Sequence, residues 1–201
     1  MQSSKEEIKT IIGTEMGGGF YAGRILVDGK PYALIVAPKN EGEHEDAELL
    51  EDSVGSDVAR SPFDGLANTK QLAAEGSELA QWALDLRIAG HDDWYIPAQD
   101  ELEIIYRNLK PTTQDNYIYN RSGMNLSAIE PTRPYAENFP LQTTAELFKE
   151  GAAQAFDDVW HWSSSLVGSS GAWVQDFRNG GVSYGYVYGL YRARAVRRLA
   201  I

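Results

Sequence analysis

The chain has 201 residues, contains no cysteine and carries a formal net charge of −11. This length fits one domain, or one domain plus a short attachment segment, and the core it can bury needs no covalent staple. The lack of cysteine excludes disulfides, a thiolate nucleophile and cysteine-bound zinc, and the acidity argues against a protein that binds duplex DNA.

The negative charge is unevenly placed. Up to Lys110 there are 21 acidic and 10 basic residues, whereas from Pro111 onward there are 8 of each. Residues 41–57 hold eight acidic residues and no basic one, and a solvated loop is the plainest interpretation of this stretch. The alternative is a cation site with ligands from Asp46, Glu48, Glu51 and Asp52. Because the spacing lacks the regular pattern of a calcium loop, we predict no metal site and no cofactor.

The first residues carry no visible export signal. Residues 1–7 lack the basic start and apolar run of a secretory signal, and no stretch approaches the roughly 20 apolar residues of a membrane span. We expect residues 1–19 to be an attachment or oligomerisation segment, because Ile8, Ile11 and Ile12 lie at helical spacing just before a glycine triplet. So short an apolar stripe needs a partner to form a stable helix, and the alternative is a frayed terminus.

Residues 20–38 carry the pattern of a β-hairpin. Two apolar runs are separated by Asp28-Gly29, a signal typical of a two-residue turn, and Pro38 ends the second run. We therefore predict one strand over residues 21–27 and its return strand over residues 32–37.

Two helices are expected after the hairpin. The first begins at Asn68 or Thr69, where either side chain can act as a cap, and ends at Gly90. The second begins after Pro97, has acidic residues near its amino end and ends before Pro111. Apolar residues at helical spacing form the inward stripes: Leu72, Leu79, Ala83 and Leu86 in the first helix, and Leu102, Ile105, Tyr106 and Leu109 in the second.

The middle of the chain is less regular. Trp94, on the connector between the two helices, is predicted to be buried. Residues 112–140 form a long polar stretch with little periodicity, and a loop of this length inside a compact domain is often functional. Thr143 and Glu146 have the spacing of a capping box for a short helix that Gly151 closes.

Residues 159–198 contain four short strand-like runs separated by Gly, Ser and Asn turns. Tyr184, Tyr186 and Tyr188 alternate at period two, so one strand would place all three on the same face, and Gly185 and Gly189 would leave the opposite side flat. Buried tyrosines need hydroxyl partners, which three in a row would be hard to supply. We therefore predict an exposed or half-exposed tyrosine ladder, with a sheet core as the alternative.

The other aromatic residues of these strands are expected to be core residues. Trp173 and Phe177 are assigned to the core. Trp160 and Trp162 share one face of a strand, so His161 between them points the other way and is interpreted as a structural histidine.

The arginines near the carboxyl end form the one basic cluster of the chain: Arg192, Arg194, Arg197 and Arg198. Arg192 and Arg194 share one face of a strand. We expect these arginines to pair with the surplus carboxylates of the chain, and we expect no nucleic-acid partner.

We find no pattern that predicts an enzyme. The three histidines lie in separate segments without a serine triad, a paired-histidine metal motif or a phosphate loop. Asp157 and Asp158 could serve as a carboxylate pair for glycoside hydrolysis, but neighbours on a strand point apart, which suits an acid/base couple badly.

Several segments together resemble a known family. Residues 93–102, Asp-Trp-Tyr-Ile-Pro-Ala-Gln-Asp-Glu-Leu, resemble the entry to the second helix in a C-type-lectin-like family found on phage tails and at the C-terminus of a collagen-like bacterial adhesin. The later signature of that family is similar to Trp162-Ser163-Ser164-Ser165, to the run from Ala172-Trp173 to Phe177 with Asn179-Gly180, and to Arg194-Ala195-Val196-Arg197. The resemblance spans residues 20–199, and residues 33–39 and 106–111 are similar to the phage-borne branch.

The resemblance implies an α+β, C-type lectin-like fold for residues 20–201, with an N-terminal hairpin, two helices and C-terminal antiparallel strands. Calcium-dependent sugar binding in such lectins uses a Glu-Pro-Asn type loop, and Glu130-Pro131-Thr132 lacks the amide ligand. The formylglycine-generating enzymes share the broader fold but depend on cysteine, which this chain lacks. The resemblance therefore implies a binding module and not an enzyme.

The relatives include variable receptor-binding proteins whose last strands contact the target. The corresponding positions, expected to bind the ligand, are Ser169, Ser170, Gln175, Asn179, Ser183, Tyr184, Tyr186, Tyr188 and Tyr191. The resemblance implies a receptor-binding or adhesion module at the tip of a phage tail or fibre, located in the virion after assembly in the host cytoplasm. Its partner would be a host cell-surface protein or glycan.

Residues 1–19 would join the module to other tail or fibre proteins. We expect a homo-oligomer, and a trimer by analogy with the three-fold symmetry of tail fibres. The alternative function is a structural virion protein that joins or caps tail components, with the aromatic strands as its protein interface.

Overall fold

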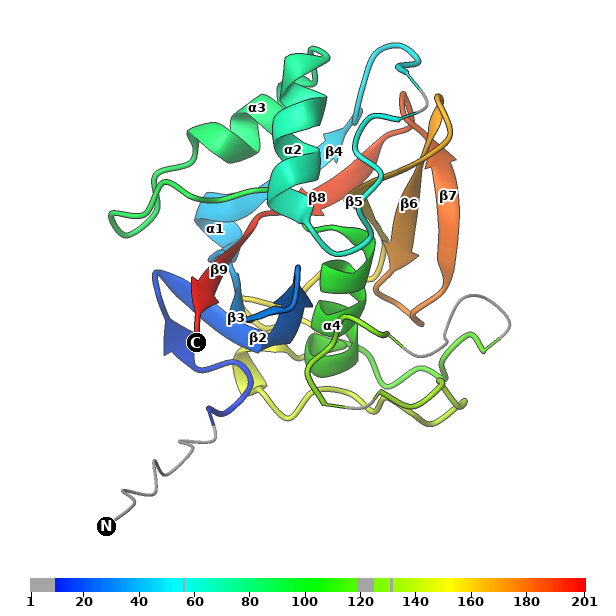
Figure 1. The fold of residues 1–201 in the computed structure, drawn as a ribbon. Helices are drawn as coiled ribbons and strands as arrows, with labels where there is room; N and C mark the ends of the chain where they lie inside the picture. Colours follow the sequence, from blue (N-terminus) through cyan, green and yellow to red (C-terminus); the bar gives the residue numbers. More distant parts are fainter. Residues whose placement is uncertain (1–9, 56, 119–124, 131) are drawn as a thin grey trace.

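The computed structural model describes residues 10–55, 57–118, 125–130 and 132–201. The fold is α+β, as predicted, with two sheets in the orders β1-β2-β3-β9 and β4-β8-β5-β6-β7 (Figure 1). The strands are β1 Glu15–Met16, β2 Gly19–Val27, β3 Lys30–Val36, β4 Glu43–Ala47, β5 Trp160–Val167, β6 Gly171–Asp176, β7 Val182–Tyr186, β8 Tyr191–Arg194 and β9 Val196–Ala200. The helices are α1 Lys39–Gly42, α2 Gly65–Ala74, α3 Glu78–Asp85 and α4 Gln99–Leu109, with one 3-10 turn, η1 Glu146–Phe148.

The predicted hairpin is confirmed. Strands β2 and β3 pair antiparallel, and both turn residues have positive φ, 49° at Asp28 and 75° at Gly29, as the favoured two-residue hairpin turn requires. The C-terminal strand β9 pairs with the free side of β3, from Val36 opposite Val196 onward. The two ends of the domain therefore share one sheet (Figure 1).

Residues 10–19 belong to this sheet rather than to a separate helix. Strand β1 pairs with β2, with Glu15 opposite Phe20. The amide of Gly13 donates to the carbonyl of Tyr21, and the side chain of Ile12 packs against two core clusters. The expected apolar stripe includes Ile8, which lies outside the described residues.

The first predicted helix is wrong in its bounds and its continuity. It begins at Gly65, where the Asp64 side chain accepts from the amide of Ala67, and it stops at Ala74. Gly76 takes a φ of +93° and the Ser77 side chain caps a second helix, α3. A glycine in the left-handed region followed by a capping serine ends one helix and starts another, which outweighs the continuous apolar stripe.

The second predicted helix, α4, is confirmed, and all four residues of its inward stripe are buried. It packs against the hairpin sheet around the first core cluster, which includes Ile25, Leu34 and Ile105. A second cluster lies between the helices α2 and α3 and the five-stranded sheet, with Leu72 and Trp162 among its members. Trp94 is fully buried, as predicted, in a third cluster on the other face of the hairpin sheet.

None of the helices in the described part of the chain is long and apolar enough to cross a bilayer.

The capping box predicted near residue 143 does not form. The Thr143 hydroxyl accepts from the amide of Ala145 at 3.2 Å, and the segment makes only the single 3-10 turn of η1, which has no side-chain cap. The turn ends at the buried Phe148, so no α-helix follows that Thr143 and Glu146 could cap.

Strands β5, β6 and β7 form the antiparallel ribbon that the sequence predicted. Strand β8 differs, because it runs parallel to β5 on the side away from β6 and pairs antiparallel with β4. The chain crosses the sheet after Tyr186 and continues through β8 into β9 of the other sheet (Figure 1).

The arginines of β8 and β9 pair within the chain, as expected. Each contacts a carboxylate: Arg192 and Arg194 contact Glu43, Arg197 contacts Asp93, and Arg198 contacts Asp64. The basic cluster therefore ties the strands to earlier parts of the chain.

Candidate functional site

The β6–β7 hairpin presents two of the predicted tyrosines on one open face. The register sets Tyr184 opposite Trp173 and Tyr186 opposite Gly171, and residues directly opposite each other in a sheet share a face. Tyr184 is 63% exposed and Tyr186 is 61% exposed. Tyr188, in the turn after β7, is 51% exposed. The prediction that these side chains are exposed is confirmed.

Tyr186 and Tyr188 form a preformed aromatic pair. Their ring centroids lie 5.2 Å apart and their planes are within 3° of parallel. The turn between them is fixed by the amide of Gly189, which donates to the carbonyl of Tyr186 at 2.7 Å, and by Val187, whose side chain is buried. The backbone that carries both rings is therefore fixed by this hydrogen bond and by the buried side chain of Val187.

The opposite side of β7 is bare at Gly185, as predicted, and it is covered by another ring. Tyr191 packs so closely there that a β-carbon added at Gly185 would lie 2.5 Å from Tyr191 Cε2. Tyr191 in turn meets Trp162 edge to face, with centroids 4.6 Å apart. Gly185 is needed because an aromatic ring packs directly on its backbone.

The nine predicted ligand-binding positions divide into three places. The first place holds Ser169 and Ser170 in the turn before β6, Tyr184 and Tyr186 on the open face, and Tyr188 in the turn after β7. Gln175 and Asn179 lie at the other end of the hairpin, where the Asn179 Oδ1 accepts from the amide of Gly181 at 3.0 Å. Ser183 and Tyr191 are half-buried on the side that faces the second core cluster.

A small hollow lies at the foot of the open face, between the hairpin and α4. From the sheet it is lined by Trp173, Gln175 and Val182, and from α4 by Asp100 and Glu103. Trp173 was predicted to be a core residue, and this is wrong: it is half-buried and forms one wall of the hollow. Phe177 is fully buried, as predicted, since it follows the end of the strand and turns inward.

The carboxylates of the hollow are held by neighbours. The hydroxyl of Ser127 donates to Asp100 at 2.6 Å, and the amide of Asn125 donates to Glu103 at 2.8 Å. Glu103 also accepts from the Tyr135 hydroxyl at 3.0 Å and pairs with Arg107. These acids serve the packing of the loop against α4, and they are less available to a ligand than the tyrosines.

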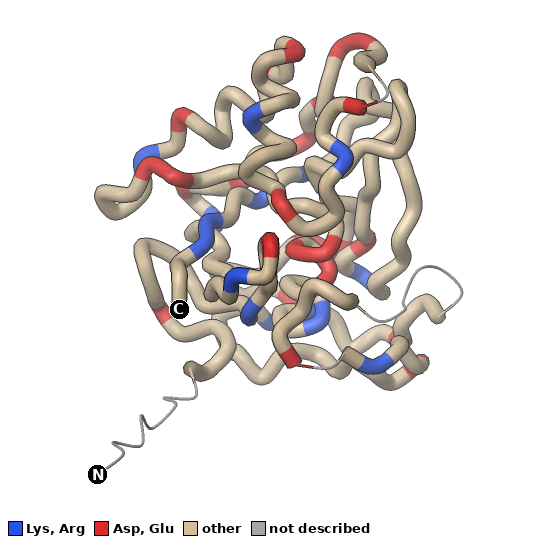
Figure 2. Tube along the Cα trace, in the orientation of Figure 1, with Lys and Arg blue, Asp and Glu red and all other residues tan. Residues whose placement is uncertain are grey.

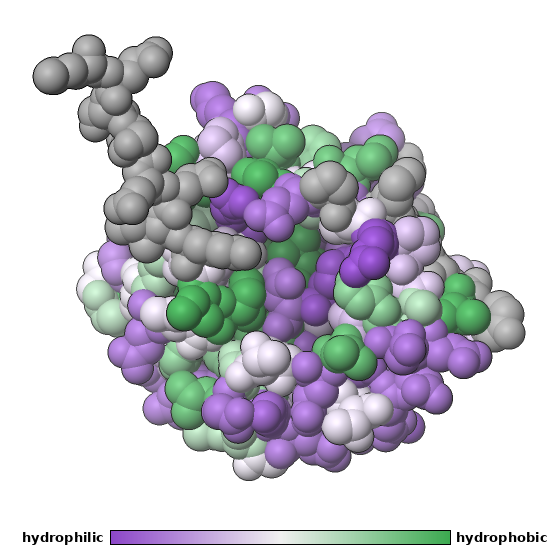
Figure 3. Space-filling model, turned by 90° about the horizontal axis from the view of Figure 1, so that it is seen from below, coloured by the Kyte–Doolittle hydropathy of each residue, from purple (hydrophilic) through white to green (hydrophobic). Residues whose placement is uncertain are grey.

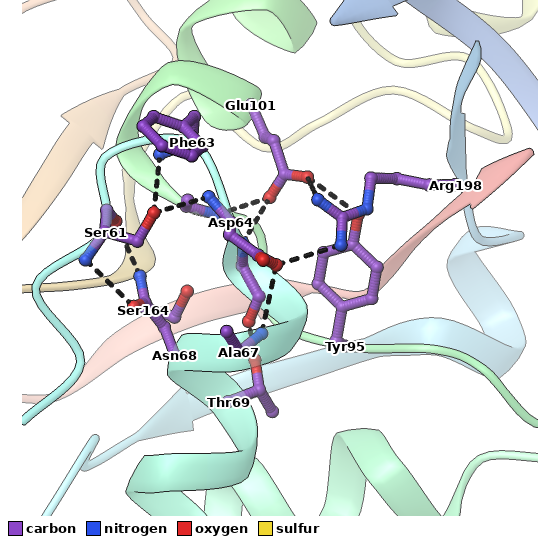
Figure 4. Close-up of polar contacts among 12 residues, drawn as sticks. Ser61, Phe63, Asp64, Ala67, Asn68, Thr69, Tyr95, Glu101, Ser164 and Arg198 are labelled. Carbon is purple, nitrogen blue, oxygen red and sulfur yellow. Dashed lines mark hydrogen bonds and ion pairs between the residues drawn. The ribbon is translucent and has the colours of Figure 1, made fainter. Parts of the chain in front are cut away.

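A buried polar network fixes α4 in place (Figure 4). Glu101 accepts from the amide of Ala98 and from the hydroxyl of Tyr95, both at 2.7 Å. Arg198 lies beside it and pairs with Asp64 at 2.9 Å. Burial raises the pKa of Glu101 to about 7, although the nearby guanidinium opposes the rise. The network joins α2, α4 and β9, which is a structural role.

His161 is a core residue, as predicted. Its ring is fully buried beside Phe156 and Phe177, and its Nδ1 lies 2.9 Å from the carbonyl of Val159. Burial lowers the pKa of His161 to about 3, so the ring is neutral at pH 7 and its Nδ1 donates to the carbonyl.

The two neighbouring aspartates point to different partners. Asp157 contacts Lys39 at 2.8 Å and Arg192 at 2.9 Å, whereas Asp158 lies 3.6 Å from Arg178. Burial acts to raise the pKa of Asp157, but the hydrogen bond and charge of Lys39 outweigh it and hold the pKa below its usual value. A general acid needs a raised pKa, which Asp157 does not have, and the two side chains pair with different cations, so they do not form an acid/base couple.

The acidic stretch of residues 41–57 contributes a neighbour of the tyrosines that the sequence did not reveal. Part of it is strand β4, and Glu43 is buried against Arg194. The amides of Leu49 and Leu50 both donate to the carbonyl of Val187, between the stacked tyrosines in sequence. Among the described residues no group of acidic and histidine side chains is arranged to hold a metal ion.

No signal in the sequence alone predicted the contact between the acidic loop and the tyrosine turn, because it is made by backbone groups far apart in the chain.

No protein-family model matches this chain. No curated protein matches it either.

Proposed function

We propose that this chain is a receptor-binding or adhesion module with a C-type lectin-like fold, carried at the tip of a phage tail or fibre. The observation that carries the proposal is the set of Tyr184, Tyr186 and Tyr188, exposed together on a rigid frame. Tyrosine offers a large contact area with two side-chain torsions to freeze and a hydroxyl for hydrogen bonds, so it suits recognition surfaces.

Contacts between the motif segments support the likeness to the C-type-lectin-like family. The hydroxyl of Ser164 donates to the carbonyl of Ile96 at 2.9 Å, and the amide of Gln99 donates to the Ser165 hydroxyl at 3.0 Å. The serine-rich strand therefore binds directly to the connector that enters α4. Pairing of β9 with the N-terminal hairpin and the presence of helices beside the sheets also agree with the arrangement that the resemblance implies.

The lower face supports an attachment role for the N-terminal segment. Seen from below, hydrophobic residues gather next to the place where the chain enters the domain (Figure 3). Ile11 is 74% exposed there, and Gly13 packs against Ala145 beside η1, whose Leu147 is also exposed. The stacked tyrosines lie at the upper end of β7, away from this entry (Figure 1). We propose that residues 1–19 join other tail or fibre proteins and that the opposite end binds a host cell-surface protein or glycan.

The test measures adsorption of the purified protein to candidate host cells and to purified virion parts. We expect Tyr184→Ala, Tyr186→Ala and Tyr188→Ala to weaken adsorption to cells without lowering the melting temperature. Leu141→Ala, which removes an equally exposed apolar side chain, is the matched control and should adsorb normally. Binding to virion parts alone, with no adsorption to any cell tested, would contradict the receptor role and favour the structural virion protein.

A further inference from the structure

We infer that the partner presents arginine or lysine side chains to the tyrosine face, so that the target is a cationic protein segment. This inference rests on the proposed binding function and names the chemistry of its partner. The proposed surface consists of Tyr184, Tyr186 and Tyr188 together with the acidic loop of residues 48–54.

Two backbone hydrogen bonds attach the acidic loop to the tyrosine turn, and a third attaches it to the turn before β6. The amides of Leu49 and Leu50 donate to the carbonyl of Val187 at 2.8 and 3.0 Å, and the amide of Val54 donates to the carbonyl of Ser169 at 2.9 Å. The amide of Val187 itself donates to Ser170 at 3.0 Å. The acidic loop, the turn before β6 and the tyrosine turn are therefore fixed to one another, and the loop arches over this end of the sheet (Figures 1 and 2).

The carboxylates of this loop differ from the other acids of the chain. Glu48, Glu51 and Asp52 are exposed and make no ion pair with any of the residues that the structure describes. By contrast, Glu43 is paired with three cations and Asp157 with two. The loop thus carries exposed carboxylates that pair with no described cation, on a segment whose backbone is bonded to the turn between Tyr186 and Tyr188.

Aromatic faces and carboxylates together match a guanidinium or ammonium group. A cation is attracted to the face of a tyrosine ring, and a planar guanidinium can also stack on it while it donates to a carboxylate. The same carboxylates disfavour an anionic glycan, because like charges in an interface are repelled. The charge of this surface therefore selects a basic protein segment over an acidic surface polysaccharide.

The experiment uses a peptide of alternating arginine and glycine as the probe, and the same peptide with glutamine in place of arginine as its neutral partner. The charge variant combines Glu48→Gln, Glu51→Gln and Asp52→Asn, which remove three charges and keep the side-chain shapes. The control variant combines Asp28→Asn, Asp92→Asn and Glu137→Gln, three exposed acids on other parts of the surface. Both variants lose the same net charge.

We expect the wild type to bind the arginine peptide and not the glutamine peptide, more weakly as salt is raised. The charge variant should bind the arginine peptide about tenfold more weakly at low salt, because it loses the carboxylates that attract and pair with the arginines. The affinity of the control variant should stay within about twofold of the wild type, because its substituted acids are distant from the peptide and screened by salt. The double variant of Tyr186→Ala and Tyr188→Ala should also lose binding. Equal losses in the charge variant and its control, or binding of a neutral oligosaccharide with none of the peptide, would overturn the inference.

Adsorption to host cells separates this inference from the proposed function. If the tyrosine variants fail to adsorb while the charge variant adsorbs like the wild type, the receptor role stands and the cationic partner is wrong. If neither set of variants changes adsorption, the proposed function fails, and the inference fails with it.

Discussion

The two faces of the β6–β7 hairpin use the same residue type in opposite ways. On the outer face Tyr184 and Tyr186 stand more than 60% exposed, whereas on the inner face Tyr191 is half-buried between Gly185 and Trp162. Alternation along β7 turns Tyr184 and Tyr186 outward and leaves Gly185 on the inner side, where Tyr191 of β8 packs. The inner ring fixes the backbone, and the outer rings are thereby free to serve recognition.

This division has an energetic meaning. Residues buried on the inner face contribute to the free energy of unfolding through apolar burial and close packing. Residues on the outer face contribute little to it, since substitutions at exposed positions usually change stability by less than about 0.5 kcal/mol.

The largest effect is expected for Trp162→Ala. The indole is fully buried in the second core cluster and its Nε1 donates to the carbonyl of Ala47 at 2.7 Å. Loss of the side chain should lower the free energy of unfolding by about 3–5 kcal/mol, measured by urea denaturation. Leu190→Ala, which truncates a side chain that is 61% exposed, is the control and should change little. A loss below about 1 kcal/mol in Trp162→Ala would show that the inner face is not packed as described.

A smaller loss is expected for Gly185→Ala. The new methyl group would meet the Tyr191 ring at 2.5 Å, so the ring or the strand must shift, at a cost of about 1–3 kcal/mol in unfolding free energy. Gly55→Ala serves as the control, because its new methyl group would meet only one atom, Val58 Cγ2, at 3.8 Å. Equal stability of the two variants would contradict the contact between Tyr191 and the β7 backbone.

A pH effect is expected from His161. Burial lowers its pKa to about 3 from an ordinary value of 6.5, so the unfolded chain binds a proton more readily than the folded protein. Stability from this group is complete above pH 6.5 and is lost as the pH falls from 6.5 toward 3. His161→Phe, which keeps a ring beside Phe177, should remove this loss.

The measurement is the difference in melting temperature between wild type and His161→Phe at a series of pH values. Glu101 acts in the opposite direction, because its pKa is raised to about 7 and its protonation favours the folded state below that pH. Comparing two proteins that both contain Glu101 removes this contribution. A difference that does not change between pH 7 and pH 4.5 would contradict the buried neutral histidine.

The smallest effect on stability is expected for Tyr186→Ala, which should leave the unfolding free energy within about 0.5 kcal/mol of the wild type. Its stacking partner Tyr188 is itself exposed, so little packing is lost. A drop of 2 kcal/mol or more, on the order of a core truncation, would place this ring in the core and not on a recognition surface.

Local signals in the sequence predicted the parts of the fold that depend on neighbouring residues. Asp28-Gly29 gave the hairpin turn, the apolar stripe gave α4, and period-two tyrosines gave the exposed face. The break at Gly76 was missed although its glycine and the following serine cap were visible, because the apolar stripe continued through it.

Long-range placements could not be predicted in the same way. Strand β8 joins β5 and β4 and not β7, and this places the ring of Tyr191 against Gly185 of β7, a contact between strands that no local pattern marks. Trp173 became a wall of the hollow because α4 stands off from the sheet at that point. The acidic loop reaches the tyrosine turn through the carbonyl of Val187, a backbone group that no side-chain pattern marks.

The most direct test of the central claim is chemical labelling of tyrosine rings, with and without adherent host cells, followed by mass spectrometry. We predict that Tyr184, Tyr186 and Tyr188 are labelled in the free protein and protected when it is adsorbed, while the buried Tyr95 stays unlabelled in both states. Labelling of the three tyrosines that persists unchanged on adsorbed protein would contradict the claim that this face binds the target.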